Sequence, residues 1–437
     1  MQNSGSPKKL IRITTVPMAL RYLLPGQMNY MNTNGYEVVM ISADGRELAE
    51  VVAEEKCRHI VVPMTRKITP IQDLKCLWQL VKIFREERPD IVHSHTPKAG
   101  LLGMLAAKIA GVNTRIHTVA GLPLMVEKGL KFQILKTVEK ITYAAANHVW
   151  PNSQSLMDFI KKKKLTSARK LHLIGNGSTN GINVGRFSPE SLDPSIMQQV
   201  KDQISYDSNK TYLLSIGRLV KDKGIVEVVE SFANLHAQND TLRLILVGDF
   251  EQELDPLPES TLYQIKQNDA IIHIPWSNHV QYFMHLANNF IFASHREGFP
   301  NVLLQAGAMN LPVICSRISG NVDIVSQNET GLLFAPGNLK QMQNLIQYAI
   351  THTQVVQSMA VKLRDKIQRE FQRDEIWAKI HSQYSLITAA TPVRISLVQQ
   401  LTDVASSLWQ QPAIAVRYFF LSLQMRRATR RASSPAM

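Results

Sequence analysis

Two charged residues in the second half of the chain have the types and spacing to bind a phosphorylated ligand. Arg218 and Lys223 lie in SIGRLVKDKG, residues 215–224, directly after an apolar run that is typical of a strand. A guanidinium can bind a diphosphate through two parallel hydrogen bonds, and an ammonium adds a compact positive charge. The segment therefore indicates a diphosphate site, and the alternative is a pair of solvated charges on a surface loop.

A second stretch, NFIFASHREGFPNVLLQAGAMN at residues 289–310, has the pattern of a strand, a polar turn and a helix. The apolar residues 290–293 predict the strand, and Pro300 predicts the first turn of the helix, where a missing N–H group costs nothing. The start of a helix attracts anions because its first N–H groups have no partner within the helix. An ordinary strand-to-helix crossover is the alternative interpretation.

Five residues of this stretch are candidates for ligand contacts. The backbone N–H groups around Phe299 and Asn301, with the turn residue Gly298, would face an anion above the strand's carboxyl end. Glu297 precedes the helix and can reach a ligand held over its start. Gln305 lies eight positions later and can reach the far side of that ligand.

Strands alternate with helices along most of the chain, which predicts an α/β protein with parallel strands and crossover connections. At 437 residues the chain exceeds one ordinary core, so we expect two doubly wound, Rossmann-like sheets with a ligand at the carboxyl ends of their strands. The glycine-rich segment 175–190 is interpreted as the hinge. The predicted strands are 10–16, 37–43, 59–64, 90–95, 114–119, 148–151, 212–217, 242–248, 270–275, 290–293, 312–316 and 332–334, and one long helical run is predicted over 339–371.

The predicted division is a first domain over residues 1–186, a second over 187–371, a helix over 372–390 that returns to the first domain, and a basic tail over 391–437. Residues 1–186 hold 27 Lys and Arg against 13 Asp and Glu, whereas residues 187–390 hold 16 against 21. One domain is therefore strongly basic, and we expect it to face something anionic.

Composition indicates a protein of the reducing cytoplasm. The three cysteines are far apart and form no metal-type pair, and we find neither a signal peptide nor a run that could span a bilayer. The basic run Lys161–Lys164 with Arg169 and Lys170, and the tail over 413–431 with its apolar and arginine residues, predict peripheral binding to an anionic membrane surface. The alternatives are a solvated face for the run and a helix that docks on the first domain for the tail.

The residues above resemble the signatures of family 4 retaining glycosyltransferases. Residues 297–305 resemble Glu-Gly-Phe-Pro-x-x-x-x-Glu, with Gln305 in place of the last glutamate, and residues 217–224 resemble Gly-Arg-Leu-x-x-x-Lys-Gly. HSHTPKAGLLGMLAAKIAGVNTRIHTVAGLP, residues 93–123, is similar to the acceptor-domain signature of a bacterial branch that builds lipid-linked surface polysaccharides. The resemblance extends to about residue 390 and implies the two-domain fold called GT-B.

The resemblance also implies roles for individual residues. Arg218 and Lys223 would hold the donor's phosphates, and Glu297 would position the donor sugar. His117, predicted at a strand end that points into the cleft, would touch that sugar, and the backbone at Gly26 would approach the phosphates. As isolated residues, His117 is more typical of a core or surface histidine, and Gly26 of a plain turn.

The implied reaction is transfer of a sugar from a nucleotide sugar, with a leaning to a UDP-sugar, to a polyprenyl-diphosphate-linked or other surface glycan, with retention of configuration. The sequence contains no Asp-x-Asp, so we expect neither a bridging metal nor a resident cofactor. At Gln305 a neutral amide replaces a carboxylate, which predicts weaker donor binding. The alternatives are a nucleotide-sugar epimerase and a catalytically weakened relative; nucleic-acid binding has no recognisable module to support it.

Overall fold

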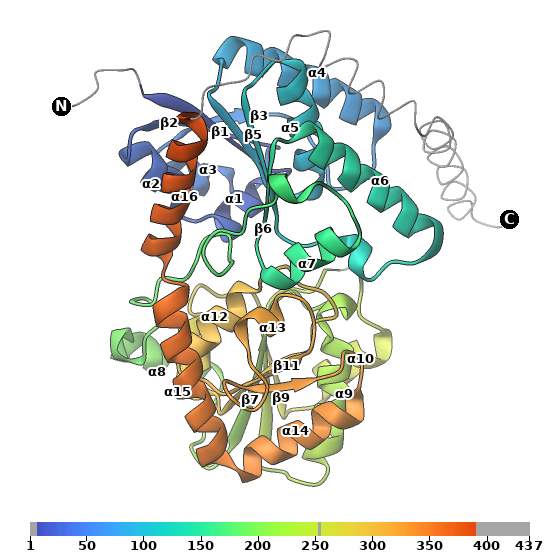
Figure 1. The fold of residues 1–437 in the computed structure, drawn as a ribbon. Helices are drawn as coiled ribbons and strands as arrows, with labels where there is room; N and C mark the ends of the chain where they lie inside the picture. The colour runs from blue at the N-terminus through green and yellow to red at the C-terminus, as the bar shows by residue number, and fades with distance from the viewer. Residues whose placement is uncertain (1–6, 252–254, 390–437) are drawn as a thin grey trace, which may run out of the picture. The chain divides into compact units, whose positions relative to one another are not determined.

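The computed structural model describes residues 7–251 and 255–389, which form two compact α/β units (Figure 1). Among the described residues, unit 1 comprises 7–151, 157–173 and 377–389, and unit 2 comprises 152–156, 174–251 and 255–376. The main division thus falls after Leu173, just before the glycine-rich segment 175–190. The sequence analysis predicted it at residue 186. The basic tail from residue 391 lies outside the described residues.

Unit 1 is built on a six-stranded parallel sheet with the order β3-β2-β1-β4-β5-β6. Its central strands are apolar on both faces because helices cover both, and Leu10, Ile11 and Ile13 of β1 are fully buried. Such strands read as continuous apolar runs, which is why the sequence predicts them well. The strands are β1 (Lys8–Ile13), β2 (Tyr36–Ser42), β3 (Arg58–Val61), β4 (Ile91–Ser94), β5 (Thr114–Val119) and β6 (His148–Pro151).

Helices surround the sheet of unit 1. Helix α5 packs against β4 and β5 and contacts α4 on one side and α6 on the other. The helices are α1 (Pro17–Leu23), α2 (Gln27–Thr33), α3 (Leu48–Glu55), α4 (Pro70–Glu87), α5 (Pro97–Ile109), α6 (Gly129–Ala145), α7 (Gln154–Lys162) and α16 (Arg373–Ala389); the last two each begin among residues of unit 2. Short 3-10 turns occur at Pro123–Met125 and Ala168–Lys170.

Unit 2 repeats this topology with the order β12-β11-β10-β7-β8-β9. Counted within their own unit, the strands of both sheets follow the order 3-2-1-4-5-6, in which the winding reverses between the first and fourth strands. In unit 2 that reversal lies between β7 and β10. The strands are β7 (Thr211–Ile216), β8 (Leu242–Val247), β9 (Ile271–Ile274), β10 (Asn289–Phe292), β11 (Val313–Ser316) and β12 (Leu332–Phe334).

The helices of unit 2 correct one expectation. The predicted helical run over 339–371 is two helices, α14 and α15, because the backbone leaves the helical conformation at His352 (φ −118°, ψ 51°). The helices are α8 (Pro194–Gln203), α9 (Ile225–His236), α10 (Glu259–Gln267), α11 (Val280–Leu286), α12 (Asn301–Ala308), α13 (Asn321–Ile324), α14 (Leu339–Thr351) and α15 (Thr353–Glu370), with 3-10 turns at Pro189–Ser191 and Lys221–Lys223. Across the described ranges, none of the helices has both the length and the apolar content that a membrane span requires.

Candidate active site

The two sequence stretches with the candidate ligand residues follow neighbouring strands of unit 2. Strands β7 and β10 pair in parallel, with Asn289 opposite Leu213 and Phe290 opposite Leu214. The loop after β7, with Arg218 and Lys223, and the loop after β10, with Glu297, therefore leave the sheet at the same edge. This edge, between the two strands where the winding reverses, is where doubly wound sheets bind ligands.

Lys223 and Glu297 meet at this edge. The ammonium of Lys223 donates a hydrogen bond to Oε1 of Glu297, and both side chains are largely buried, with 20% and 14% of their surfaces exposed. An ion pair at such a position loses less to solvent than a surface pair does. The pair places one cation and one carboxylate side by side, which suits a ligand that combines a phosphate with neighbouring hydroxyl groups.

The same two loops are joined by further contacts that the sequence analysis did not identify. The His295 N–H donates to the Asp222 carbonyl at 2.9 Å, and the Arg296 guanidinium pairs with the Asp222 carboxylate at 2.8 Å. The imidazole of His295 lies 2.8 Å from Glu227 of α9, and this hydrogen bond raises the pKa of His295 above its usual 6.5. The loops are thus held as one structure, so that Lys223 and Glu297 keep their relative position.

Close backbone packing at this edge depends on two glycines. A Cβ atom at Gly224 (φ +71°), which begins α9, would lie 2.2 Å from the carbonyl oxygen of Ala293 at the end of β10. A Cβ atom at Gly320 (φ +82°), in the loop after β11, would lie 2.4 Å from the carbonyl oxygen of Gly298. Both distances are far below van der Waals contact, and both backbones are left-handed, so glycine is the residue that fits at these positions.

The start of α12 has the features expected of an anion site. Pro300 precedes the first helical residue, Asn301, and among the described residues the N–H groups of Gly298, Phe299 and Asn301 have no hydrogen-bond acceptor. The side chain of Phe299 instead packs in the core, with its ring 5.3 Å from that of Phe371. The contribution of Phe299 to a ligand would therefore come from its backbone.

Gln305 lies in α12, half-buried, and its side chain makes no hydrogen bond to another residue in the described parts of the chain. Its amide is thus available to a ligand above the helix. Arg218 lies in the same loop as Lys223 and pairs with Glu251, with 44% of its side-chain surface exposed. A pair with this exposure contributes little to stability, so Arg218 can exchange Glu251 for a phosphate at small cost.

His117 belongs to unit 1 and is not at a strand end. It lies inside β5, which continues to Val119, and it is 3% exposed. Its Nδ1 lies 2.9 Å from Oγ of Ser94, and a Cβ atom at Gly100 of α5 would lie 2.4 Å from the imidazole. Burial lowers the pKa of His117 to about 4, so the ring is neutral at physiological pH. Its contact with a donor sugar stays a prediction.

Gly26 also belongs to unit 1, and its backbone N–H is already engaged. It donates at 2.5 Å to the carboxylate of Glu55, which also accepts from Asn29 at 2.9 Å. The left-handed backbone of Gly26 (φ +80°) lies against the indole of Trp377, 2.8 Å from where a Cβ atom would be. In this structure Gly26 therefore serves the packing of α16 and the start of α2, and its predicted role near phosphates stays untested.

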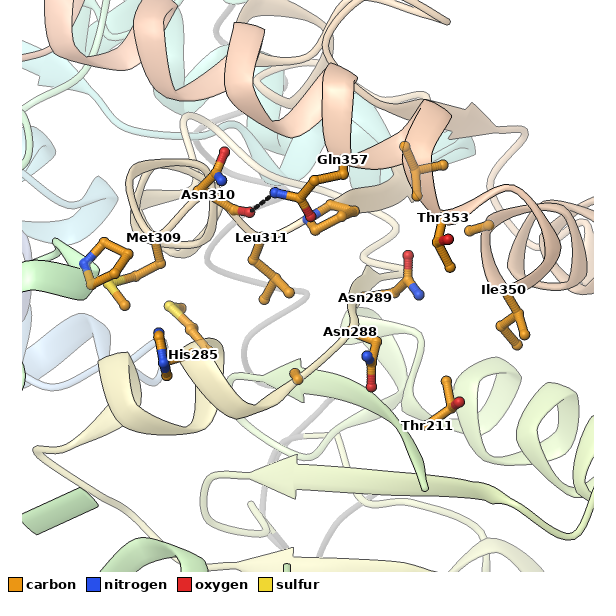
Figure 2. Close-up of a pocket in the computed structure, with 16 residues that line it drawn as sticks. Thr211, His285, Asn288, Asn289, Met309, Asn310, Leu311, Ile350, Thr353 and Gln357 are labelled. Carbon is orange, nitrogen blue, oxygen red and sulfur yellow. Dashed lines mark hydrogen bonds between the residues drawn. The ribbon is translucent and has the colours of Figure 1, made fainter. Parts of the chain in front are cut away.

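A cavity of about 330 Å³ in unit 2 is separate from this edge (Figure 2). It is lined by Thr211 at the start of β7, Asn289 at the start of β10 and Pro312 before β11. These residues mark the amino ends of the strands, whereas the charged loops follow the carboxyl ends. The cavity therefore lies at the other end of the strands from the candidate site and is not part of it.

The chemistry available at the charged edge is electrostatic. Two cations, Arg218 and Lys223, and the start of α12 can oppose negative charge that develops on a leaving diphosphate. In the described ranges, no group of three or more His, Cys, Asp or Glu side chains is arranged to hold a metal ion. The backbone N–H of the half-exposed Trp276 donates to the Asp249 carboxylate at 3.1 Å. An acidic and an aromatic residue thus follow β8 and β9, and the sequence analysis did not identify them.

Two family models and several known proteins match this chain. The family model for Glycosyl transferases group 1 matches residues 197–369, and that for the Glycosyl transferase 4-like domain matches residues 26–177. The capsular polysaccharide biosynthesis glycosyltransferase CapM of Staphylococcus aureus is 32% identical over 379 residues, which cover 86% of this chain and 97% of CapM. The UDP-Gal:alpha-D-GlcNAc-diphosphoundecaprenol alpha-1,3-galactosyltransferase of Escherichia coli is 22% identical, covering 85% of this chain and 95% of that protein.

Solved structures show the same fold. The Anabaena protein Alr3699/HepE in complex with UDP and glucose matches with a TM-score of 0.72 at 17% identity, covering 87% of this chain and 100% of that one. WaaG, described as a glycosyltransferase of lipopolysaccharide biosynthesis, matches with a TM-score of 0.65 at 14% identity, covering 86% and 99%. The expected pair of Rossmann-like domains is confirmed.

Proposed function

The chain belongs to the family 4 glycosyltransferases of the GT-B fold, and from this membership we propose that it moves a sugar, with retention of configuration, from a UDP-sugar to a polyprenyl-diphosphate-linked glycan. The observation that carries the proposal is the Lys223–Glu297 pair at the strand edge where the winding of unit 2 reverses. The names of CapM and of the Escherichia coli galactosyltransferase support surface-polysaccharide assembly and a lipid-linked acceptor.

The donor's diphosphate lies over the start of α12 in this proposal. Lys223, Arg218 and the N–H groups of Gly298, Phe299 and Asn301 oppose its negative charge without a bridging metal. As the bond from the anomeric carbon to the phosphate oxygen breaks, its electron pair leaves with UDP. The acceptor hydroxyl bonds to the same face of that carbon, and its proton passes to the departing phosphate.

Glu297 has a different task from the cations beside it. Its carboxylate accepts from Lys223 and has further lone pairs for the hydroxyl groups of the donor sugar. A sugar held in this way keeps its anomeric carbon next to the phosphate that Lys223 neutralises. Gln305 holds the ribose through its amide oxygen, more weakly than a carboxylate would.

The acceptor's lipid requires the enzyme to work at a membrane, and we place it on the cytoplasmic face of the plasma membrane as a peripheral protein. The excess of Lys and Arg in residues 1–186 supports attraction to anionic lipid. Part of the predicted basic run has another use, because Lys170 donates at 2.9 and 2.7 Å to the carbonyls of Tyr143 and Ala146 at the end of α6. The remaining lysines of the run lie on or beside α7.

The proposal is tested by incubating the protein with a panel of radiolabelled UDP-sugars and polyprenyl-diphosphate glycans, with and without EDTA. We expect one donor to label the lipid-linked product, an α-configured product from an α-configured donor by NMR, and no loss of rate with EDTA. An inverted product, or donor turnover that needs no acceptor, would overturn the proposal; the latter would favour the epimerase alternative. Lys223→Met should lower the rate of transfer by about 10- to 100-fold, because a charged hydrogen bond is lost.

A further inference from the structure

Helix α4 of unit 1 has two apolar faces, and one of them is exposed. Its buried face consists of Cys76, Leu80, Val81, Ile83 and Phe84, and the helix packs against α5. On its outer face Ile71, Leu74 and Trp78 are spaced three and four residues apart, so they form one stripe along the first two turns. These three side chains are 67%, 56% and 56% exposed.

The stripe continues into the loop before the helix, where Ile68 is 60% exposed. Single exposed apolar residues are ordinary in soluble proteins, but four large ones in eleven positions form a patch that needs a partner. Figure 1 shows α4 next to α5 in unit 1. The exposed fractions of the four side chains show that the described part of the unit leaves this face uncovered.

The charges around the stripe are positive. Exposed basic side chains flank it on the loop and along the helix, at Arg66, Lys67, Lys75 and Arg85. The carboxylates of α4 are each neutralised by a cation: Asp73 by Lys98 at 2.7 Å, Glu86 by Lys82 at 3.8 Å, and Glu87 by Lys9 at 3.0 Å and by Arg58. The stripe therefore lies in a positive field.

An apolar stripe with basic flanks on a helix matches the surface of an anionic bilayer, where apolar side chains enter the acyl boundary and cations meet the headgroups. The indole of Trp78 suits the same depth, because it combines a large apolar ring with one N–H donor. An acidic protein partner would match the cations but would leave Ile71 and Leu74 without an apolar counterpart.

We propose that this face is the membrane-docking surface of the protein, which lays the first two turns of α4 in the interface of a leaflet that contains anionic lipid, with Ile68, Ile71, Leu74 and Trp78 inserted. The inference rests on the membrane-bound acceptor of the proposed function and adds the surface that reaches it. It also makes docking a property of unit 1.

The test uses the full chain in flotation assays with extruded vesicles of phosphatidylglycerol and phosphatidylethanolamine, and with vesicles of phosphatidylcholine alone. We expect the triple variant I71S/L74S/W78S to lower the partition constant on the anionic vesicles by at least about tenfold, because three inserted apolar side chains are lost. The matched control replaces three exposed apolar residues of unit 2, Tyr263, Val355 and Val361, with serine and should stay within about twofold of the wild type.

A second measurement does not depend on comparing affinities. The difference between the fluorescence spectra of the wild type and W78F reports on Trp78, and this difference should shift to the blue when anionic vesicles are added. The shift should disappear in high salt, which screens the attraction of the cations. A difference spectrum that does not move, or a triple variant that floats like the wild type, would overturn the proposed surface.

Enzyme assays distinguish failure of the proposed docking surface from failure of the proposed function. With a short-chain, water-soluble acceptor analogue the triple variant should transfer sugar at the wild-type rate, and with a vesicle-embedded acceptor it should be slower. A wild type that transfers sugar to the soluble analogue but does not float with vesicles would overturn the proposed docking surface and leave the proposed function unchanged.

A wild type that floats with vesicles through α4 but transfers no sugar would overturn the proposed function and leave the docking surface unchanged. Loss of a dimer in the triple variant, with unchanged flotation, would assign the stripe to self-association and overturn the proposal.

Discussion

Replacing Gly224 with alanine should damage the candidate site through the backbone alone. Gly224 follows Lys223 directly, and its added Cβ atom would lie 2.2 Å from the carbonyl oxygen of Ala293 and 2.6 Å from its Cβ atom. Both atoms belong to Ala293, which directly follows β10 and begins the loop that carries Glu297. Relief of the clash requires a separation of about 1 Å between the two loops, since ordinary contact begins near 3.4 Å.

A matched control exists in the same unit. Gly337 has φ +72° against +71° for Gly224, but the nearest atom to its added Cβ is Cε1 of His295 at 3.8 Å, an ordinary contact. Gly337→Ala therefore has the backbone strain without the clash and should cost about 1–2 kcal/mol. Gly224→Ala has the same strain and adds overpacking against backbone atoms, which costs about 1–3 kcal/mol more.

The two variants should differ more in activity than in stability. A displacement of about 1 Å at a positioning element can reduce the rate about 100-fold, and in Gly224→Ala it would separate Lys223 from Glu297. We expect kcat/KM for the donor to fall by about 10- to 100-fold in Gly224→Ala and by less than about threefold in Gly337→Ala. Urea unfolding gives the stabilities and initial rates of transfer give the activities. Equal losses of stability and activity in the two variants would refute the reasoning.

Three further predictions concern single side chains. Gln305→Glu should tighten UDP-sugar binding by about 1–2 kcal/mol, since a charged acceptor replaces a neutral one; calorimetry that shows equal or weaker binding contradicts this. Glu297→Gln should lower kcat by about 10- to 100-fold and leave the Kd of UDP within about threefold, because UDP lacks the transferred sugar that Glu297 holds. Glu139 is buried in α6, and burial raises its pKa to about 7. The folded state therefore loses stability as the pH rises from about 4.5 to 7, and Glu139→Gln should recover up to about 3 kcal/mol at pH 8 and nothing at pH 4, measured by urea unfolding.

The strands were predictable because parallel strands covered on both faces are apolar at consecutive positions. All twelve strands of the described sheets lie within about three residues of the predicted ranges, and β5, β6 and β12 match them fully. The ends of β1 differ from the prediction: the strand begins at Lys8 and ends at Ile13, whereas the apolar run suggested residues 10–16. Pairing with β2 explains the early start, because Lys8 and Lys9 lie opposite Tyr36 and Glu37.

The break between α14 and α15 was not predictable from local signals. The segment around His352 contains neither proline nor glycine, so the helical pattern continues through it. In the structure the two helices bury different faces, α14 through Met342 and Ile346 and α15 through Leu363 and Ile367. Helix α14 packs on α9 and α15 on α12, so tertiary contacts decide where the helix ends.

At the candidate site the sequence predicted which loops meet but not how they are joined. Strand order follows from topology, so residues after β7 and β10 were expected at one edge. The contacts of Asp222 with His295 and Arg296 depend on side-chain directions that a pattern of residue types does not contain. For His117 the same limitation led to a wrong prediction, since His117 lies inside β5 and not at its end. The sequence pattern is the same whether the side chain at 117 faces a cleft or a helix.

Arg12 shows how a sequence can pose a structural requirement without revealing its solution. It is a charged residue in the middle of the apolar strand β1 and is 1% exposed, so it must have polar partners. The structure supplies Gln27, His93 at 3.0 Å and the hydroxyl group of Tyr384, which is 372 residues away on α16. No carboxylate is among these partners, so the guanidinium is held by neutral acceptors. Removal of the Tyr384 hydroxyl would leave the buried guanidinium of Arg12 without one of its acceptors. The hydrogen bond from Arg12 to Tyr384 therefore helps to hold α16 against the sheet of unit 1.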